Sequence, residues 1–141
     1  MVRQKITVVN HYEILQTFHG GSMVIRGIYN ALSEWFDITL VTFHDDLDLY
    51  CDRIWMNEHF CIVPLEKPVA LKEIESDFIQ EVALDKINVY DSSIAVSRYY
   101  VGVTKFVCAV QRIAVDSAIL IAEHPYTYRL LKNALPNNII W

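Results

Sequence analysis

The chain is 141 residues long, carries a formal net charge of -5, and is 53% hydrophobic and 21% charged. This composition excludes an intrinsically disordered protein, and the length is sufficient for one domain with a buried core. No cluster of Lys and Arg is present, so the sequence lacks the positive surface that nucleic-acid binding requires. We therefore expect no nucleic-acid partner.

Two further features bear on the compartment in which the protein works. The longest apolar runs, such as Ala118–Ala122, are too short to span a bilayer, and the basic start MVRQK is not followed by a cleavage-site pattern. We therefore predict a cytoplasmic protein. The three cysteines, Cys51, Cys61 and Cys108, form no C-x-x-C pair and are expected to be reduced thiols packed in the interior.

The first third of the chain predicts a strand, a helix and a second strand. The apolar run Lys5–Asn10 is typical of a strand, and a polar loop leads from it to a helix that is expected to begin at Ser22, as N-cap, and to end near Phe36. The run Ile38–Phe43 is almost continuously apolar, as in a strand covered on both faces. The predicted apolar stripe of the helix consists of Ile25, Ile28, Leu32 and Trp35.

The rest of the chain continues this alternation. A polar loop is expected after the second strand, followed by a third strand over residues 60–65 that is closed by Pro64 and Pro68. Residues 69–91 have a weak pattern that allows a helix. The remaining predicted elements are a long helix over 92–116, a fourth strand that begins at 118, a short helix over 126–135 and a fifth strand over 138–141.

Alternating strands and helices predict one α/β domain over residues 1–141. We expect a Rossmann-like parallel sheet in the order 3-2-1-4-5, with helices on both faces and right-handed crossovers. The sequence ends in the apolar residues Ile139, Ile140 and Trp141, which would form an exposed terminal strand. We therefore expect the domain to be truncated at its C-terminal end and to belong to a longer protein.

Polar residues follow the first and the fourth predicted strands. Asn10 and His11 end the first strand, and Glu123 and His124 end the fourth. Ligands of open α/β sheets bind at the carboxyl ends of the strands, so these residues are candidates for a site. A histidine there can donate a hydrogen bond to a sugar hydroxyl or a phosphate, and Glu123 could orient it. A pair that caps a helix or serves the core is the alternative.

A second candidate feature is the glycine turn before the first helix. Gly20 and Gly21 allow the backbone to approach a ligand closely, although such a pair can also serve only a turn. Arg26 is expected in the first helical turn, where the positive helix end disfavours a cation by about 0.3 to 1 kcal/mol and a bound anion would relieve that cost. A solvated arginine is the alternative for Arg26.

Other motifs receive simpler interpretations. Asp46 and Asp48 form a D-x-D pattern by which some glycosyltransferases hold a metal ion, but an acidic surface loop is favoured and no metal is expected. The chain has no G-x-G-x-x-G fingerprint, so a nicotinamide cofactor is discounted and no other cofactor is expected. His19 is interpreted as loop surface, and His44 and His59 are interpreted as structural residues.

Four segments considered together resemble a known family. ITVVN, HGGSMVIRGIYNAL, FDITLVTF and ILIAEHPYTYRLL resemble, in order and spacing, the N-terminal domain of GT-B glycosyltransferases of the family 4 type. The resemblance covers most of the chain. It implies that Gly20 and Gly21 lie against the donor phosphates or the acceptor, and that His124 is the cleft histidine near the transferred sugar. We assign His124 as the catalytic residue and Asn10, His11, Gly20, Gly21, Arg26 and Glu123 as substrate-binding residues.

The resemblance also implies an activity and partners. The full-length protein would transfer a hexosyl group from a nucleotide-sugar donor to a glycan or lipid-linked acceptor, with retention of configuration and no required metal. A peripheral membrane contact of the full-length protein would fit such an acceptor. The family's second domain, with its E-x7-E carboxylates, is absent from these 141 residues, so this chain alone is expected to be inactive.

Two other functions were weighed. A non-catalytic α/β ligand-binding or interaction module is the alternative to the enzyme. A response-regulator receiver is disfavoured because the first strand ends in Asn10 and His11 rather than in acidic residues, and the third ends in Pro64 and Leu65 rather than in a phosphorylatable Asp.

Overall fold

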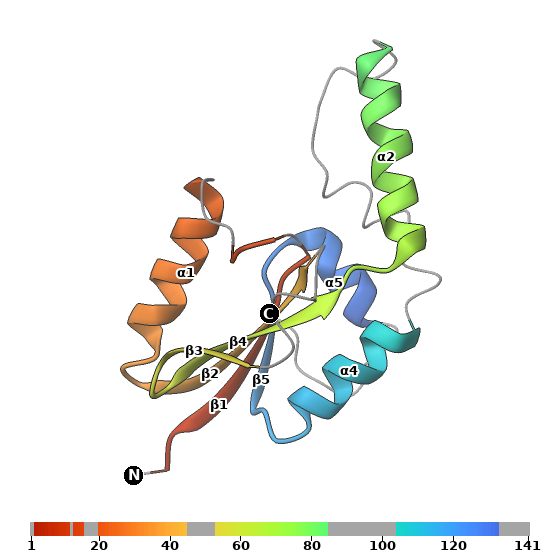
Figure 1. Cartoon of the computed structure of the whole chain (residues 1–141). Coiled ribbons are helices and arrows are strands. Elements are labelled where there is room, and N and C mark those ends of the chain that lie inside the picture. The colour runs from red at the N-terminus through yellow and green to blue at the C-terminus, as the bar shows by residue number, and fades with distance from the viewer. Residues whose placement is uncertain (1, 12, 16–19, 45–52, 85–103, 133–141) are drawn as a thin grey trace.

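The computed structural model describes residues 2–11, 13–15, 20–44, 53–84 and 104–132 (Figure 1). In chain order the elements are β1 (Gln4–Val9), α1 (Gly20–Leu32), β2 (Phe36–His44), β3 (Ile54–Asn57), β4 (Phe60–Glu66), α2 (Val69–Ala83), α4 (Thr104–Ala114), β5 (Ile119–Ala122) and α5 (Pro125–Lys132). The chain is thus an α/β structure, as the alternating sequence pattern predicts.

The described strands form one five-stranded sheet in the order β3-β4-β2-β1-β5. β1 pairs in parallel with both β2 and β5, and β2 pairs in parallel with β4. The predicted order of the first four strands is confirmed. The predicted fifth strand, over 138–141, lies outside the described residues.

One strand was not predicted, and it makes the sheet mixed rather than parallel. β3 lies in the stretch interpreted as a polar loop, and it pairs antiparallel with β4 at the edge of the sheet. Its burial alternates, because Ile54 and Met56 are half-buried whereas Trp55 and Asn57 are exposed. Four residues next to many acidic and polar neighbours gave too short a pattern to distinguish a strand from a loop.

The third predicted strand also continues further than expected. Pro64 is buried inside β4, where it lies opposite Thr42 of β2, and the strand ends only at Glu66. β3 pairs with β4 over Phe60–Ile62 only, so Pro64 has β2 as its one neighbouring strand among the described residues. A position with one open side tolerates the missing backbone N-H of proline.

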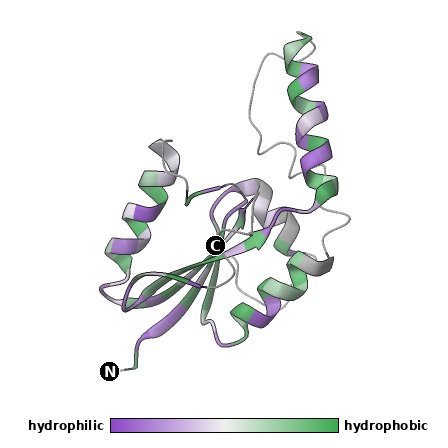
Figure 2. Ribbon diagram, viewed as in Figure 1, coloured by the Kyte–Doolittle hydropathy of each residue, from purple (hydrophilic) through white to green (hydrophobic). Residues whose placement is uncertain are grey.

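Helices cover both faces of the sheet (Figure 1). α1 packs on one face, in a cluster formed by side chains such as Val8, Ile25, Leu40 and Ile62. α4, α5 and the start of α2 pack on the other face, in a cluster that includes Val41, Leu71, Val110, Leu120 and Leu131. Figure 2 shows hydrophobic residues along the centre of the sheet, whereas α2 alternates between hydrophilic and hydrophobic residues. The rest of α2 extends beyond the sheet (Figure 1).

The position and the buried side of α1 differ from the prediction. The helix begins at Gly20, so Ser22 lies inside its first turn rather than at its N-cap. The helix ends at Leu32 rather than near Phe36, so Trp35 lies beyond it and is 62% exposed. The buried side of the helix consists of Ser22, Ile25 and Tyr29, whereas Ile28 is 48% exposed. Hydrogen bonds from Ser22 and Tyr29 to groups at the end of the sheet hold this side inward, and apolar periodicity alone does not reveal such contacts.

The later helices agree with the pattern where they are described. The segment after β4 forms α2, and the short helix after β5 forms α5. The predicted long helix over 92–116 is described only from Thr104, where α4 begins, to its end at Ala114. Of the cysteines, Cys61 is buried as predicted but Cys108 is exposed on α4, which contradicts the expected interior position; Cys51 lies outside the described residues.

Candidate functional site

The sheet changes its winding direction beside β1. From β1 the chain passes through α1 to β2 on one side, and it returns much later through α4 to β5 on the other side. α1, which follows β1, and α5, which follows β5, pack on opposite faces of the sheet, so the chain leaves these two strands toward opposite faces (Figure 1). In open α/β sheets such a switch point leaves a crevice at the carboxyl ends of the strands, where ligands bind.

Two histidines meet at this switch point. The rings of His11, after β1, and His124, after β5, contact each other edge to face, with centroids 5.2 Å apart and planes at 73°. His11 is 2% exposed, and its Nδ1 lies 3.0 Å from the hydroxyl of Thr127 in α5. The sequence predicted both histidines at this edge but not the contribution of Thr127.

The backbone of His124 is fixed by the start of α5. The carbonyl oxygen of His124 accepts hydrogen bonds from the backbone N-H groups of Thr127 and Tyr128, at 2.9 and 3.3 Å. His124 therefore takes the place of an N-cap residue, as the structural alternative proposed, while the residue as a whole is half-buried and its Nδ1 atom is buried. Capping and ligand contact use different groups of this residue, so the two roles are compatible.

Glu123 does not orient His124, contrary to the prediction. Its carboxylate accepts a hydrogen bond from the hydroxyl of Tyr29 in α1, and its backbone N-H donates to the carbonyl of Val9 at 3.0 Å. The Glu123 side chain thus contacts α1, whereas the ring of His124 contacts His11. The sequence analysis does not identify Tyr29 as a site residue. Tyr29 lies four positions after Ile25, and this helical spacing places both on the buried side of α1.

Asn10 is buried between the ends of two strands. Its backbone N-H donates to the carbonyl of Val41 at 2.8 Å, and its side-chain amide donates to the hydroxyl of Thr42 at 3.2 Å. Asn10 and His11 are 0% and 2% exposed, so in this structure both support the surrounding loop rather than face solvent.

A further polar cluster holds the segment between β1 and α1. The carboxylate of Glu13 lies 3.1 Å from Nε2 of His44, which is 1% exposed at the end of β2. The hydroxyl of Ser22 donates to the carbonyl of Glu13 at 3.2 Å. This cluster links the start of α1 to the carboxyl end of β2. His44 was interpreted as structural, and the rule that polar residues gather at strand ends would have placed it beside Asn10.

The start of α1 belongs to the same edge of the sheet (Figure 1). Gly20 and Gly21 are exposed in the first turn, and a Cβ built on Gly20 would meet no atom within 4 Å. The fold therefore does not require a glycine at position 20 for packing. Arg26 is half-buried in the second turn, not the first, so the predicted conflict with the helix dipole does not apply because that effect is confined to the end turn.

No group of three or more His, Cys, Asp or Glu side chains that could hold a metal ion occurs within the described ranges. The D-x-D pattern of Asp46 and Asp48 and the loop residue His19 lie outside these ranges. In the same part of the chain, no helix has both the length and the apolar character needed to cross a membrane.

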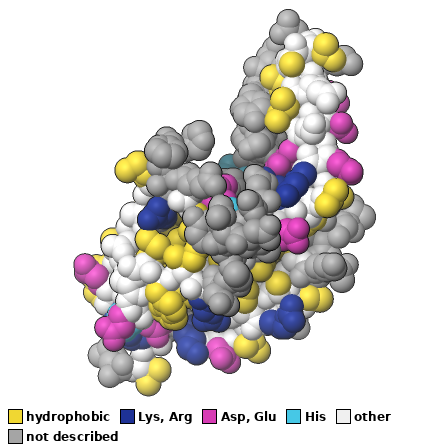
Figure 3. Space-filling model, viewed as in Figure 1, with side chains coloured by type: hydrophobic (Ala, Val, Ile, Leu, Met, Phe, Trp, Pro, Cys, Tyr) yellow, Lys and Arg dark blue, Asp and Glu magenta, His cyan; other side chains and the backbone are white. Residues whose placement is uncertain are grey.

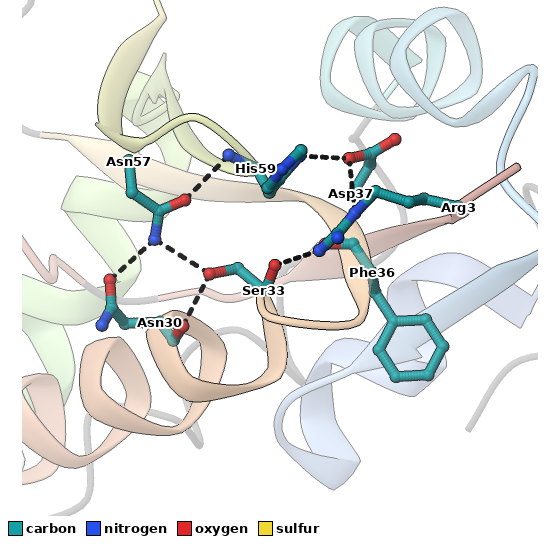
Figure 4. A network of polar contacts seen from close by, with 7 residues as sticks. All are labelled: Arg3, Asn30, Ser33, Phe36, Asp37, Asn57 and His59. Atoms are coloured by element: carbon teal, nitrogen blue, oxygen red, sulfur yellow. Dashed lines mark hydrogen bonds and ion pairs between the residues drawn. The ribbon is translucent and has the colours of Figure 1, made fainter. Parts of the chain in front are cut away.

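A separate polar network closes the opposite, amino edge of the sheet (Figure 4). Arg3 donates to the backbone carbonyl of Ser33 and lies 3.4 Å from the carboxylate of Asp37. The same carboxylate lies 2.9 Å from Nδ1 of His59, and Asn57 donates to the hydroxyl of Ser33 at 2.8 Å. The network links the residue before β1, the C-terminal end of α1, β2, the end of β3 and the turn that follows it. His59 is thus a structural residue, as predicted.

The chain was compared with protein-family models, curated proteins and solved structures. No protein-family model, curated protein or solved structure matches the chain.

Proposed function

We propose that this chain is the N-terminal, acceptor-side domain of a GT-B glycosyltransferase of the family 4 type. The observation that carries the proposal is the meeting of His11 and His124 at the switch point between β1 and β5, beside the start of α1. The crevice of an open α/β sheet is where a transferase of this architecture would hold its substrates. The resemblance of the glycine turn and of the segment around His124 agrees with this position.

In this proposal His124 is the residue that reaches the reacting sugar. Its backbone is held by α5 and its ring rests against the buried ring of His11, so few conformations are open to it. A preorganised imidazole can donate a hydrogen bond to the sugar or to the departing diphosphate, where negative charge develops in the transition state. His11 and Thr127 are positioning residues, because they act on the substrate only through His124.

The first turn of α1, which contains Gly20 and Gly21, supplies the second part of the proposed site. The first backbone N-H groups of α1 lack partners within the helix, and they attract phosphate or hydroxyl oxygens. Gly20 leaves space at this helix end, because among the described residues no atom outside the adjacent helix backbone lies within 4 Å of the place where a side chain would begin. Half-buried Arg26, one turn further along, adds a positive charge nearby. Glu123, held by Tyr29, would accept hydrogen bonds from acceptor hydroxyls.

The proposed reaction needs groups beyond these 141 residues. The second domain implied by the resemblance would provide carboxylates and most contacts to the nucleotide sugar, and the donor would bind between the two domains. Catalysis would then depend on positioning and on electrostatic stabilisation of the diphosphate.

Two experiments test this function. The first expresses the complete reading frame that contains this chain and measures release of nucleoside diphosphate from nucleotide sugars in the presence of glycan or lipid-linked acceptors. We expect release that requires an acceptor, and none from the 141-residue chain alone. Sugar transfer by the chain alone would contradict the proposal that a second domain supplies part of the active site. A reading frame without a second domain would favour the non-catalytic module.

The second experiment uses the chain itself. A ¹⁵N-labelled sample is titrated with acceptor sugars, and the amide signals of Gly20, Glu123 and His124 are followed by NMR. Changes at these residues with none at His59, on the other edge of the sheet, would support the site. Changes confined to the amino edge would contradict it.

A further inference from the structure

A hollow lies at the amino edge of the sheet, away from the proposed transferase site. Its volume is about 380 Å³, which is within the usual range of small-molecule pockets. Its walls come from β3 on one side and from the end of α4 on the other, and the starts of β1, β2 and β4 form its floor. Thr39 on the floor is separated along β2 from His44, at the carboxyl edge, by roughly 17 Å at the usual rise of a strand.

The floor of the hollow is polar, although most of the sheet is apolar. Thr39 of β2 and Cys61 of β4 line it, and Ser117 from the turn between α4 and β5 lies at its border. The thiol of Cys61 lies 3.7 Å from the hydroxyl of Thr39, and the hydroxyl of Ser117 lies 2.7 Å from that of buried Thr7. These groups can donate and accept hydrogen bonds, so the floor suits a polar ligand better than an apolar side chain.

Several charged groups around the hollow are already paired. Lys5 lies 3.7 Å from Asp116, and the carboxylate of Asp37 is shared between Arg3 at 3.4 Å and His59 at 2.9 Å. Because each positive group in these pairs lies beside a carboxylate, these five residues together attract a charged ligand only weakly.

The other charged residues of the lining are two arginines and one glutamate. Arg53 precedes β3 and Arg112 lies in the last turn of α4, and neither forms an ion pair within the part of the chain that the structure describes. The Nε-H group of Arg112 donates a hydrogen bond to the backbone carbonyl of Cys108 at 3.2 Å. Glu58 also forms no ion pair among those residues. Two guanidinium groups and one carboxylate without ion pairs among the described residues therefore line the hollow, which favours an anionic ligand.

An aromatic side chain completes the lining. Trp55 of β3 is 60% exposed, although it is a large apolar residue. An exposed indole beside cationic groups offers a flat surface on which a ring can stack. Figure 3 shows basic and acidic side chains together with hydrophobic ones at the lower end of the molecule, over the amino ends of the strands.

We propose that this hollow binds a small ring compound that carries a phosphate or a carboxylate group. The ring would stack on Trp55, the anionic oxygens would lie between Arg53 and Arg112, and the floor hydroxyls would bind the remaining polar groups. The proposal does not depend on the transferase function, because it uses no residue of the carboxyl edge.

The test is an NMR titration of the ¹⁵N-labelled chain with phenyl phosphate, benzoate and inorganic phosphate. We expect one of the ring compounds to shift the amide signals of Thr39, Cys61 and Ser117 without affecting those of Gly20 and His124. Whichever of phenyl phosphate and benzoate binds more tightly shows whether the hollow prefers a phosphate or a carboxylate. Inorganic phosphate should bind at least roughly fivefold more weakly than phenyl phosphate, because it cannot stack on the indole.

Charge-changing variants make the test specific. Arg53→Gln and Arg112→Gln should each weaken binding of the ring compound by roughly tenfold, because each removes a charged hydrogen-bond donor. Glu58→Gln should strengthen it by roughly twofold, because it removes a repelling carboxylate. Lys132→Gln, on α5, is the charge-matched control and should have no effect. All four side chains are exposed, so folding should be retained.

Three results would overturn the proposal. The first is that neither ring compound shifts the amide signals of Thr39, Cys61 and Ser117. The second is that the shifts are equally large in the Arg53→Gln and Arg112→Gln variants. Equal affinity for inorganic phosphate and phenyl phosphate would contradict the assignment of a ring compound.

Discussion

The two edges of the sheet each place a histidine beside a carboxylate, but in different surroundings. At the carboxyl edge His44 lies 3.1 Å from Glu13, and their side chains are 1% and 22% exposed. At the amino edge His59 lies 2.9 Å from Asp37, and their side chains are 33% and 40% exposed. Similar distances therefore describe pairs of different energetic weight, because water screens the second pair and is largely excluded from the first.

The polar groups at the two edges are also used differently. At the amino edge, Asn57, Ser33, Asp37 and their neighbours bind one another across four elements (Figure 4). At the carboxyl edge, buried groups support residues that reach the surface, namely half-buried His124 and exposed Gly20. The first arrangement ties secondary-structure elements together, whereas the second leaves residues partly exposed at the surface.

The largest expected effect is on activity. Under the proposed transferase function, His124→Ala should lower the turnover rate of the complete reading frame by roughly 10²- to 10³-fold, corresponding to about 2.7 to 4 kcal/mol of transition-state stabilisation. The measurements are the rate of nucleoside diphosphate release and the melting temperature. His59→Ala, at the amino edge, is the control and should leave the rate unchanged. An unchanged rate in His124→Ala would end the claim that this residue serves the chemistry.

The next effect is on stability and compares the two histidine pairs. His44→Ala should lower the free energy of unfolding by about 2 kcal/mol, because it removes a buried side chain whose Nε2 lies 3.1 Å from the Glu13 carboxylate. His59→Ala should cost only about 0.5 kcal/mol, because its pair is partly exposed and Asp37 retains Arg3. Urea unfolding of both variants measures the difference, and equal losses would show that burial does not separate the two edges.

Two glycines of α1 offer a matched comparison. A Cβ on either Gly20 or Gly27 would meet no atom within 4 Å, so Val at either position should change the free energy of unfolding by less than about 0.5 kcal/mol. Gly20→Val should nevertheless lower turnover of the complete protein by roughly tenfold, because a side chain would block the approach of a ligand to the helix start. Gly27→Val should retain full turnover. The same loss in both variants would argue for a general effect on the helix.

The smallest effect is expected at the amino edge. Asn57→Ala removes hydrogen bonds to Asn30, Ser33 and the backbone of His59, all in a largely exposed setting. We expect a loss of about 1 kcal/mol in the free energy of unfolding and no change in binding at the carboxyl edge. A shift of the Gly20 or His124 amide signals in this variant would show that the two edges are coupled.

Sequence patterns determined most of the framework. The runs that form β1, β2, β4 and β5 are apolar and bounded by polar residues, and a strand buried on both faces needs such a run whatever its neighbours are. Their order followed from the rules for connecting parallel strands, and that order placed Asn10, His11, Glu123 and His124 at one edge.

Only the tertiary structure decided how these residues pair. Tyr29 and Glu123 are separated by 94 positions, and His11 and Thr127 by 116, so no local pattern relates them. The same holds for β3, which is a strand only because β4 lies beside it, and for the side of α1 that Ser22 and Tyr29 hold inward. Apolar periodicity reports how much of each element is buried, whereas the partners of polar groups depend on distances between elements that folding alone establishes.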